Sequence, residues 1–117
     1  MENEKVFAMP TGRVYDCLVA KAERKGRSRA EVDEIITWLT GWDAAGIAQA
    51  VEQGMPYGDF FRNAPALNPA RKAIRGSICG VKVELIENST MQEIRYLDKL
   101  VDELAKGKTM DKILRKL

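Results

Sequence analysis

The chain has 117 residues, of which 45% are hydrophobic and 31% are charged, with a formal net charge of +2 and no histidine. This composition is too apolar for a disordered chain and is sufficient for one hydrophobic core, so we expect a single domain over residues 1–117. No apolar run approaches the roughly 20 residues that cross a bilayer, and no secretory signal opens the chain, which together predict a cytoplasmic protein.

Two helices are predicted near the N-terminus. Thr11 is expected to cap the first, which runs to about Lys25. Ser28 and Glu31 match a capping box, in which each side chain accepts a hydrogen bond from a backbone N–H of the other residue, so they mark the start of the second helix. The second helix has one apolar face, and its residues are Val32, Ile35, Ile36 and Leu39.

The middle of the chain combines a helix with an aromatic cluster. Asp43 is expected to cap a third helix over residues 44–53. We interpret the cluster as a core plug rather than a ligand-stacking surface, because few other large side chains are available to fill the centre. Its members are Tyr57, Phe60 and Phe61. Asn68 and Pro69 then form a cap followed by proline at the first helical position, which predicts a short basic helix.

Residues 78–86 allow more than one interpretation. Val81, Val83 and Leu85 alternate with charged residues, which is the period of a half-buried strand. Residues 5–9 are the one candidate partner, so a short two-stranded β element could form from residues 5–9 and 81–86. A short helix or an extended connector fits this stretch nearly as well.

The longest helix is predicted in the last third of the chain. Ser89, with Gln92 three residues later, is expected to cap a helix that runs to Lys106. A last amphipathic turn follows Thr109. The expected fold class is therefore mainly α, a single compact helical domain of five or six helices, with the short β element as an optional addition.

The sequence shows no assembled reactive centre. Histidine, the commonest acid–base group and metal ligand, is absent. We interpret Cys17 and Cys79 as reduced, buried thiols, so we expect no disulfide, no metal site and no cofactor. No catalytic residue can be named. We therefore favour a non-enzymatic protein over an enzyme that acts on a small anionic substrate.

Charge is distributed in alternating blocks of one sign, which can steer folding contacts or a partner. Residues 13–29 are basic, residues 31–59 acidic, residues 62–82 basic, residues 84–103 acidic, and the tail basic again. If the first basic block binds nucleic acid or a phosphate-bearing ligand, its contacts are expected from Lys21, Arg24, Lys25, Arg27 and Arg29. Acids on the following helix would repel phosphates, so we rank this function second.

Association with a protein partner or with a second copy, as in a homodimer, is the function that we favour. Basic faces would then meet acidic ones, within the monomer or between copies. No membrane contact is expected. The candidate partner or ligand surface is formed by Trp38, Trp42, Tyr57 and Arg75.

Three stretches of the sequence resemble a known bacterial family, domain of unknown function 2200. They read AKAERKGR at residues 20–27, EVDEIITWLTG at 31–41, and EIRYLDKL at 93–100 continuing with DELAKGK at 102–108. The similarity extends over nearly the whole chain. It implies a small bacterial cytoplasmic protein and brings no activity, cofactor or catalytic residue.

Overall fold

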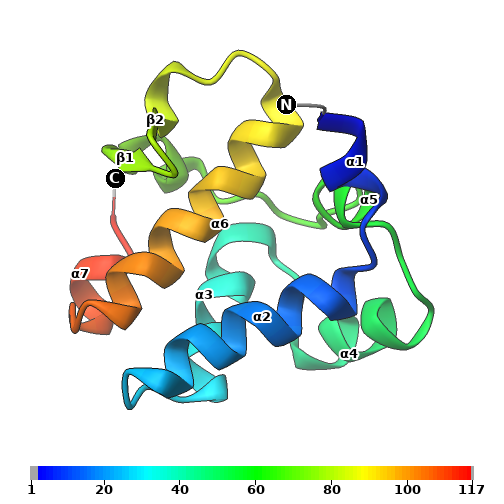
Figure 1. Cartoon of the computed structure of the whole chain (residues 1–117), viewed down its shortest axis with the longest axis horizontal. Helices are drawn as coiled ribbons and strands as arrows, with labels where there is room; N and C mark the ends of the chain where they lie inside the picture. The colour runs from blue at the N-terminus through cyan, green and yellow to red at the C-terminus, as the bar shows by residue number, and fades with distance from the viewer. Residues whose placement is uncertain (1–2, 117) are drawn as a thin grey trace.

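Helices dominate residues 3–116, the part of the chain that this computed structural model describes (Figure 1). The α-helices are α1 (Asn3–Ala8), α2 (Thr11–Arg24), α3 (Arg29–Thr40), α4 (Ala44–Glu52), α5 (Tyr57–Arg62), α6 (Ser89–Ala105) and α7 (Met110–Ile113). Two 3-10 helices, η1 (Pro69–Ala73) and η2 (Val83–Leu85), flank a hairpin of β1 (Ser77–Ile78) and β2 (Val81–Lys82). The predicted mainly helical class is confirmed, with seven α-helices in this range rather than five or six.

Helix α6 is at the centre of the packing and contacts α2, α3, α5, α7, the hairpin and η2. Helix α2 runs beside it in roughly the same direction (Figure 1). The apolar stripe of α6 is almost completely buried because these helices cover it, and its members are Ile94, Leu97, Leu100, Val101 and Leu104. Burying each of these side chains contributes about 1.5–3 kcal/mol, so this stripe contributes a substantial part of the stability.

The predicted start and end of α3 are confirmed. Ser28 Oγ accepts a hydrogen bond from the Glu31 N–H at 3.2 Å, and Glu31 Oε1 accepts one from the Ser28 N–H at 2.9 Å. Gly41 ends the helix with φ of 83°, a left-handed conformation that glycine adopts without steric cost. Asp43 then caps α4 as predicted, accepting from the Gly46 N–H at 2.7 Å.

Two predicted caps are wrong by one residue. Pro10 precedes α2, and Thr11 is its first residue, with its hydroxyl donating to the Met55 carbonyl at 2.7 Å. Thr11 therefore ties the start of α2 to the chain that precedes α5. Asn88, not Ser89, caps α6 by accepting from the Met91 N–H at 2.9 Å. Asparagine and serine are equally good caps, so residue type alone does not show which of the two precedes the helix.

The β element forms, but with a different partner from the predicted one. Residues 5–9 do not form a strand, because α1 extends to Ala8, and β2 instead pairs with β1 just before it. Cys79 and Gly80 connect the strands with φ values of 53° and 78°, as a two-residue hairpin turn requires. Closing so short a loop costs much less entropy than pairing with the N-terminus. Strand β2 ends at Lys82, and η2 replaces the rest of the predicted strand.

The aromatic cluster is part of the core, as predicted. Tyr57, Phe60 and Phe61 are each at most 2% exposed. Phe61 makes edge-to-face contacts with Tyr57 and Phe60, with ring centroids 5.1 and 5.6 Å apart. Trp42 stacks on Phe60, and its indole N–H donates to the Phe60 carbonyl at 2.9 Å. These contacts fix α5 against the loop that follows α3.

The two thiols are free, but the prediction that they are buried is wrong. Cys17 and Cys79 are both exposed. Helix α2 is rotated so that Leu18, Val19 and Ala22 face the core, which leaves Cys17 on the outer face. Cys79 is exposed because it forms the hairpin turn.

Candidate functional site

Three acidic side chains of α6 are held in ion pairs with basic residues from other parts of the chain. Glu93 is buried, and its Oε2 lies 2.8 Å from Arg71 Nε of η1. Two more pairs follow along the helix: Asp102 with Lys21 of α2 at 3.2 Å, and Glu103 with Arg115 of the tail at 2.7 Å. Burial disfavours the charge on Asp102, but hydrogen bonds from Lys106 and Lys21 lower its pKa. The blocks of opposite charge therefore meet within the monomer.

Arg27 connects three segments of the chain. Its Nε and Nη2 donate to the Glu31 carboxylate, with Nη2 2.7 Å from Oε2. Its Nη1 donates to the carbonyls of Leu104, at 3.1 Å, and Lys108, at 2.9 Å, at the end of α6. The hydrogen bond from Arg27, followed by that from the Ser28 backbone, lowers the pKa of Glu31 to about 2. This guanidinium is therefore a structural group.

Two basic segments that lie far apart in the sequence meet at one end of the molecule, which we call the basic pole (residues 21–31 and 99–116). The Arg27 contacts to Leu104 and Lys108 join them, as does the Lys21–Asp102 pair. Figure 1 shows the turn between α2 and α3 at the same end as α7. A hollow of about 470 Å³ opens here, and its charged lining residues are Lys99, Lys106, Lys108, Lys112, Asp102 and Glu103.

An apolar surface lies on the hairpin and η2. Among residues 3–116, Val81 and Leu85 are the exposed large hydrophobic side chains, at 47% and 69% exposure. They border a hollow of about 390 Å³, which Ile86 and Met91 also line, with Arg95 and Glu87 among its polar residues. We call Val81, Leu85 and Ile86 the hairpin surface; Met91 is only 6% exposed and belongs to the core.

The hairpin is held firmly on α6. Gln92 donates to the Val83 carbonyl at 3.0 Å, and Lys99 reaches the Ser77 carbonyl at 3.4 Å. Val83 is completely buried beneath the segment, and the Glu84 carboxylate accepts from the Gly76 N–H at 3.1 Å. The exposure of Val81 and Leu85 is therefore a feature of an anchored segment.

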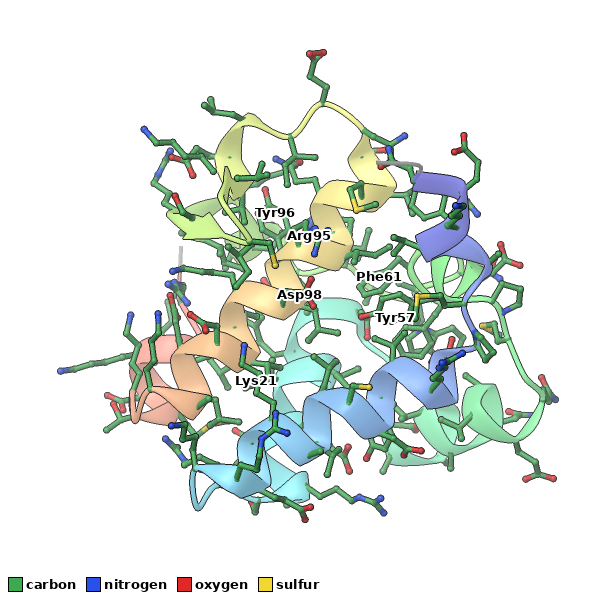
Figure 2. The ribbon with its side chains drawn as sticks, viewed as in Figure 1. Lys21, Tyr57, Phe61, Arg95, Tyr96 and Asp98 are labelled. Carbon is green, nitrogen blue, oxygen red and sulfur yellow. The ribbon has the colours of Figure 1, made fainter. Side chains whose placement is uncertain are left out.

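A polar cluster lies between α5 and α6. Arg95 donates to Asp98 at 2.9 Å, one turn further along α6, and Figure 2 shows Tyr57 beside Asp98. The Tyr57 hydroxyl is buried and has no hydrogen-bond partner among the described residues. Burial, and then the Asp98 charge, raise its pKa well above the usual value. Burial also raises the pKa of Asp98, although Arg95 and Lys21 oppose this shift.

No group of three or more His, Cys, Asp or Glu side chains within residues 3–116 is arranged to hold a metal ion. None of the helices in that range is long and apolar enough to span a membrane.

Comparison with known proteins identifies the family. The model of a family described as "Uncharacterized protein conserved in bacteria (DUF2200)" matches residues 5–115. The chain belongs to the DUF2200 family. A crystal structure described as "uncharacterized protein SP1917" is 47% identical to it, with a TM-score of 0.92, and the alignment covers 97% of this chain and 93% of the other. None of the curated proteins compared with the chain matches it.

The basic residues singled out in the sequence occupy different roles in this DUF2200 fold. Lys21 pairs with Asp102, Arg27 is held by Glu31 and two carbonyls, and Arg29 lies over the Tyr15 ring, 5.6 Å from its centroid. Arg24 and Lys25 are exposed at the end of α2. The five predicted cations therefore lie in one region of the fold, but three of them have partners within the monomer.

The four residues of the predicted partner surface do not form one patch in this DUF2200 protein. Tyr57 is 2% exposed, so it belongs to the core rather than to a surface. Trp38 and Trp42 are partly buried against the core, and Trp42 is held by Phe60. Arg75 is exposed near Glu84, whose pKa is lowered mainly by backbone hydrogen bonds and further by the Arg75 charge.

Two features of this DUF2200 chain could not be predicted from its sequence. The alternation of Val81, Val83 and Leu85 predicts a half-buried strand, but of these three side chains only Val83 is buried. The tail was recognised as basic, but its position beside the first basic block depends on the contacts of Arg27 with the end of α6. Neither the exposure of Val81 and Leu85 nor the position of the tail has a local sequence signal.

Proposed function

We propose that this protein acts by association, forming a homodimer through the hairpin surface, rather than by catalysis. The observation that supports this most directly is the exposure of Val81 and Leu85 on an anchored segment. Exposed apolar side chains beside a hollow are typical of interaction sites, because burying them against a partner releases about 25 cal/mol for each Å² removed from water.

A second copy is the partner whose charge fits this surface. Exposed Lys82 and Glu87 lie on either side of Leu85 along the chain. In a two-fold dimer the same surface meets itself, so a rim with both signs of charge is self-complementary. Each Lys82 can then face the Glu87 of the other copy. Such rim pairs are screened by salt, so the association should weaken as ionic strength rises.

The ion pairs of α6 support a non-catalytic role. Glu93, Asp102 and Glu103 are each held by a basic side chain. Carboxylates used in this way stabilise the packing of α6 against η1, α2 and the tail. A general acid or base instead needs access to a substrate proton.

Sedimentation equilibrium over a range of protein concentrations tests the proposal. We expect a monomer–dimer equilibrium whose dissociation constant rises about ten- to hundredfold in Leu85→Glu, because the leucine can no longer be buried at the interface. Ala48→Glu, which adds the same charge at an exposed position of α4, should leave the equilibrium unchanged. A wild-type protein that remains monomeric throughout, or equal losses in both variants, would contradict the proposal.

The proposed site of action is the bacterial cytoplasm. The free, exposed thiols of Cys17 and Cys79 support it, since exposed cysteines persist unpaired where the compartment is reducing. Thiol alkylation in intact bacterial cells followed by mass spectrometry should find both cysteines reduced. Recovery of oxidised Cys17 or Cys79 from untreated cells would argue against this location.

A further inference from the structure

We propose that the basic pole binds the phosphate backbone of duplex nucleic acid without reading its sequence. The first support is the charge that the fold concentrates there. Of 19 Lys and Arg and 17 Asp and Glu in the chain, residues 21–31 and 99–116 contain eleven and five. The rest of the chain contains eight and twelve, so the molecule is strongly positive at one end and negative elsewhere.

The two acids that line the hollow of the basic pole, Asp102 and Glu103, are each paired with more than one cation. Asp102 contacts both Lys21, at 3.2 Å, and Lys106, at 3.0 Å. Glu103 lies 2.7 Å from Arg115 and 3.6 Å from Lys108. A phosphate that approaches the hollow therefore meets cations before it meets an uncompensated carboxylate.

Several cations of the basic pole have side chains that are open to solvent, including the paired Lys106 and Lys108. Arg27 and Arg115 are committed to carbonyls and carboxylates, with side chains only 18% exposed. The Lys106 side chain is 73% exposed. Others are also exposed on the two segments: Arg24, Lys25, Lys108, Lys112 and Lys116. Long cationic side chains of this kind neutralise phosphates and release their counterions.

The composition of the basic pole favours a duplex over a single strand or a lipid surface. Neither segment contains Phe, Tyr or Trp, so the pole has no platform on which unpaired bases could stack. The exposed apolar side chains Val81 and Leu85 lie on the hairpin, outside these segments, so the pole has no such anchor for a lipid surface. Contact with phosphates alone is sequence-independent.

Fluorescence anisotropy with a short labelled DNA duplex tests the proposal. We expect binding at about 50 mM salt whose logarithmic affinity falls with the logarithm of salt concentration, with a slope of about −0.9 for each phosphate contacted. Arg24→Glu and Lys112→Glu, one from each segment, should each weaken binding, and the double variant should lose at least about tenfold. Both side chains are exposed, so thermal melting should stay near wild type.

The matched control is the double variant Arg13→Glu with Lys72→Glu, which makes the same change in net charge at exposed sites outside the basic pole. It should bind the duplex nearly as tightly as wild type. Absence of duplex binding at low salt, or equal losses in the two double variants, would overturn the proposal. Tighter binding to a single strand of equal length, or binding to phosphatidylserine vesicles without duplex binding, would also overturn it.

Discussion

At the scale of single residues, the most informative side chain is Glu31, because it serves a cap and an ion pair together. Its carboxylate accepts from the Ser28 N–H and from Arg27, and these contacts lower its pKa from 4.5 to about 2. A carboxyl group whose pKa is lower in the folded than in the unfolded chain stabilises the fold at pH values above its unfolded-state pKa. That contribution disappears as the pH falls from about 4.5 towards 2.

Replacing Glu31 with glutamine should therefore reduce stability at neutral pH and matter less in acid. Because the pair is partly open to solvent, we expect a loss of about 1–2 kcal/mol near neutrality. Urea unfolding of wild type and variant across this pH range measures the difference. Glu23→Gln, at an exposed carboxylate of α2, is the control and should show little effect. A wild-type advantage that persists unchanged down to the lowest pH would contradict the assignment.

Tyr57 gives a prediction of the opposite sign. Its hydroxyl is buried without a hydrogen-bond partner among the described residues, and such a group costs free energy in the folded state. Tyr57→Phe should therefore keep or raise the free energy of unfolding, by up to about 1 kcal/mol. Tyr15→Phe is the matched control, since the Tyr15 hydroxyl donates to Asp33 at 2.5 Å and its removal should destabilise. Equal destabilisation by both changes would mean that Tyr57 has a stabilising partner.

At the scale of elements, the start of α6 can be tested with two adjacent substitutions. Asn88 accepts from the Met91 N–H, whereas Ser89 is the first residue of the helix. Asn88→Ala should lower the free energy of unfolding by about 1 kcal/mol, and Ser89→Ala should change it by only a few tenths. Chemical denaturation of the two variants measures this difference. The reverse order would place the cap one residue later, as the sequence alone suggested.

Element prediction succeeded where the signal is local and was wrong where the chain had to choose between near neighbours. The capping box at Ser28, the Gly41 end and the Asp43 cap could all be predicted, because each depends on a few adjacent residues. The partner of β2 could not be predicted, because the hairpin turn requires a positive φ at Cys79, and cysteine rarely adopts one. The rotation of α2, which exposes Cys17, is likewise set by packing against α6.

At the scale of the whole molecule, the alternating charge blocks have two roles. Acids of α6 meet bases from three other parts of the chain, in the pairs with Arg71, Lys21 and Arg115. These contacts position α6 against η1, α2 and the tail. The remaining surplus of cations gathers at the basic pole, while the exposed apolar side chains lie on the hairpin. The charge blocks can be read directly from the sequence, but which blocks contact one another depends on the fold.

Amide hydrogen exchange at low and high protein concentration shows whether two copies meet through the hairpin surface. We predict that amides in residues 79–87 exchange more slowly as concentration rises, because association excludes water from that segment. Helix α4 should exchange at the same rate throughout. Exchange that does not depend on concentration at residues 79–87, or protection that appears on α4 instead, would contradict dimerisation through this surface.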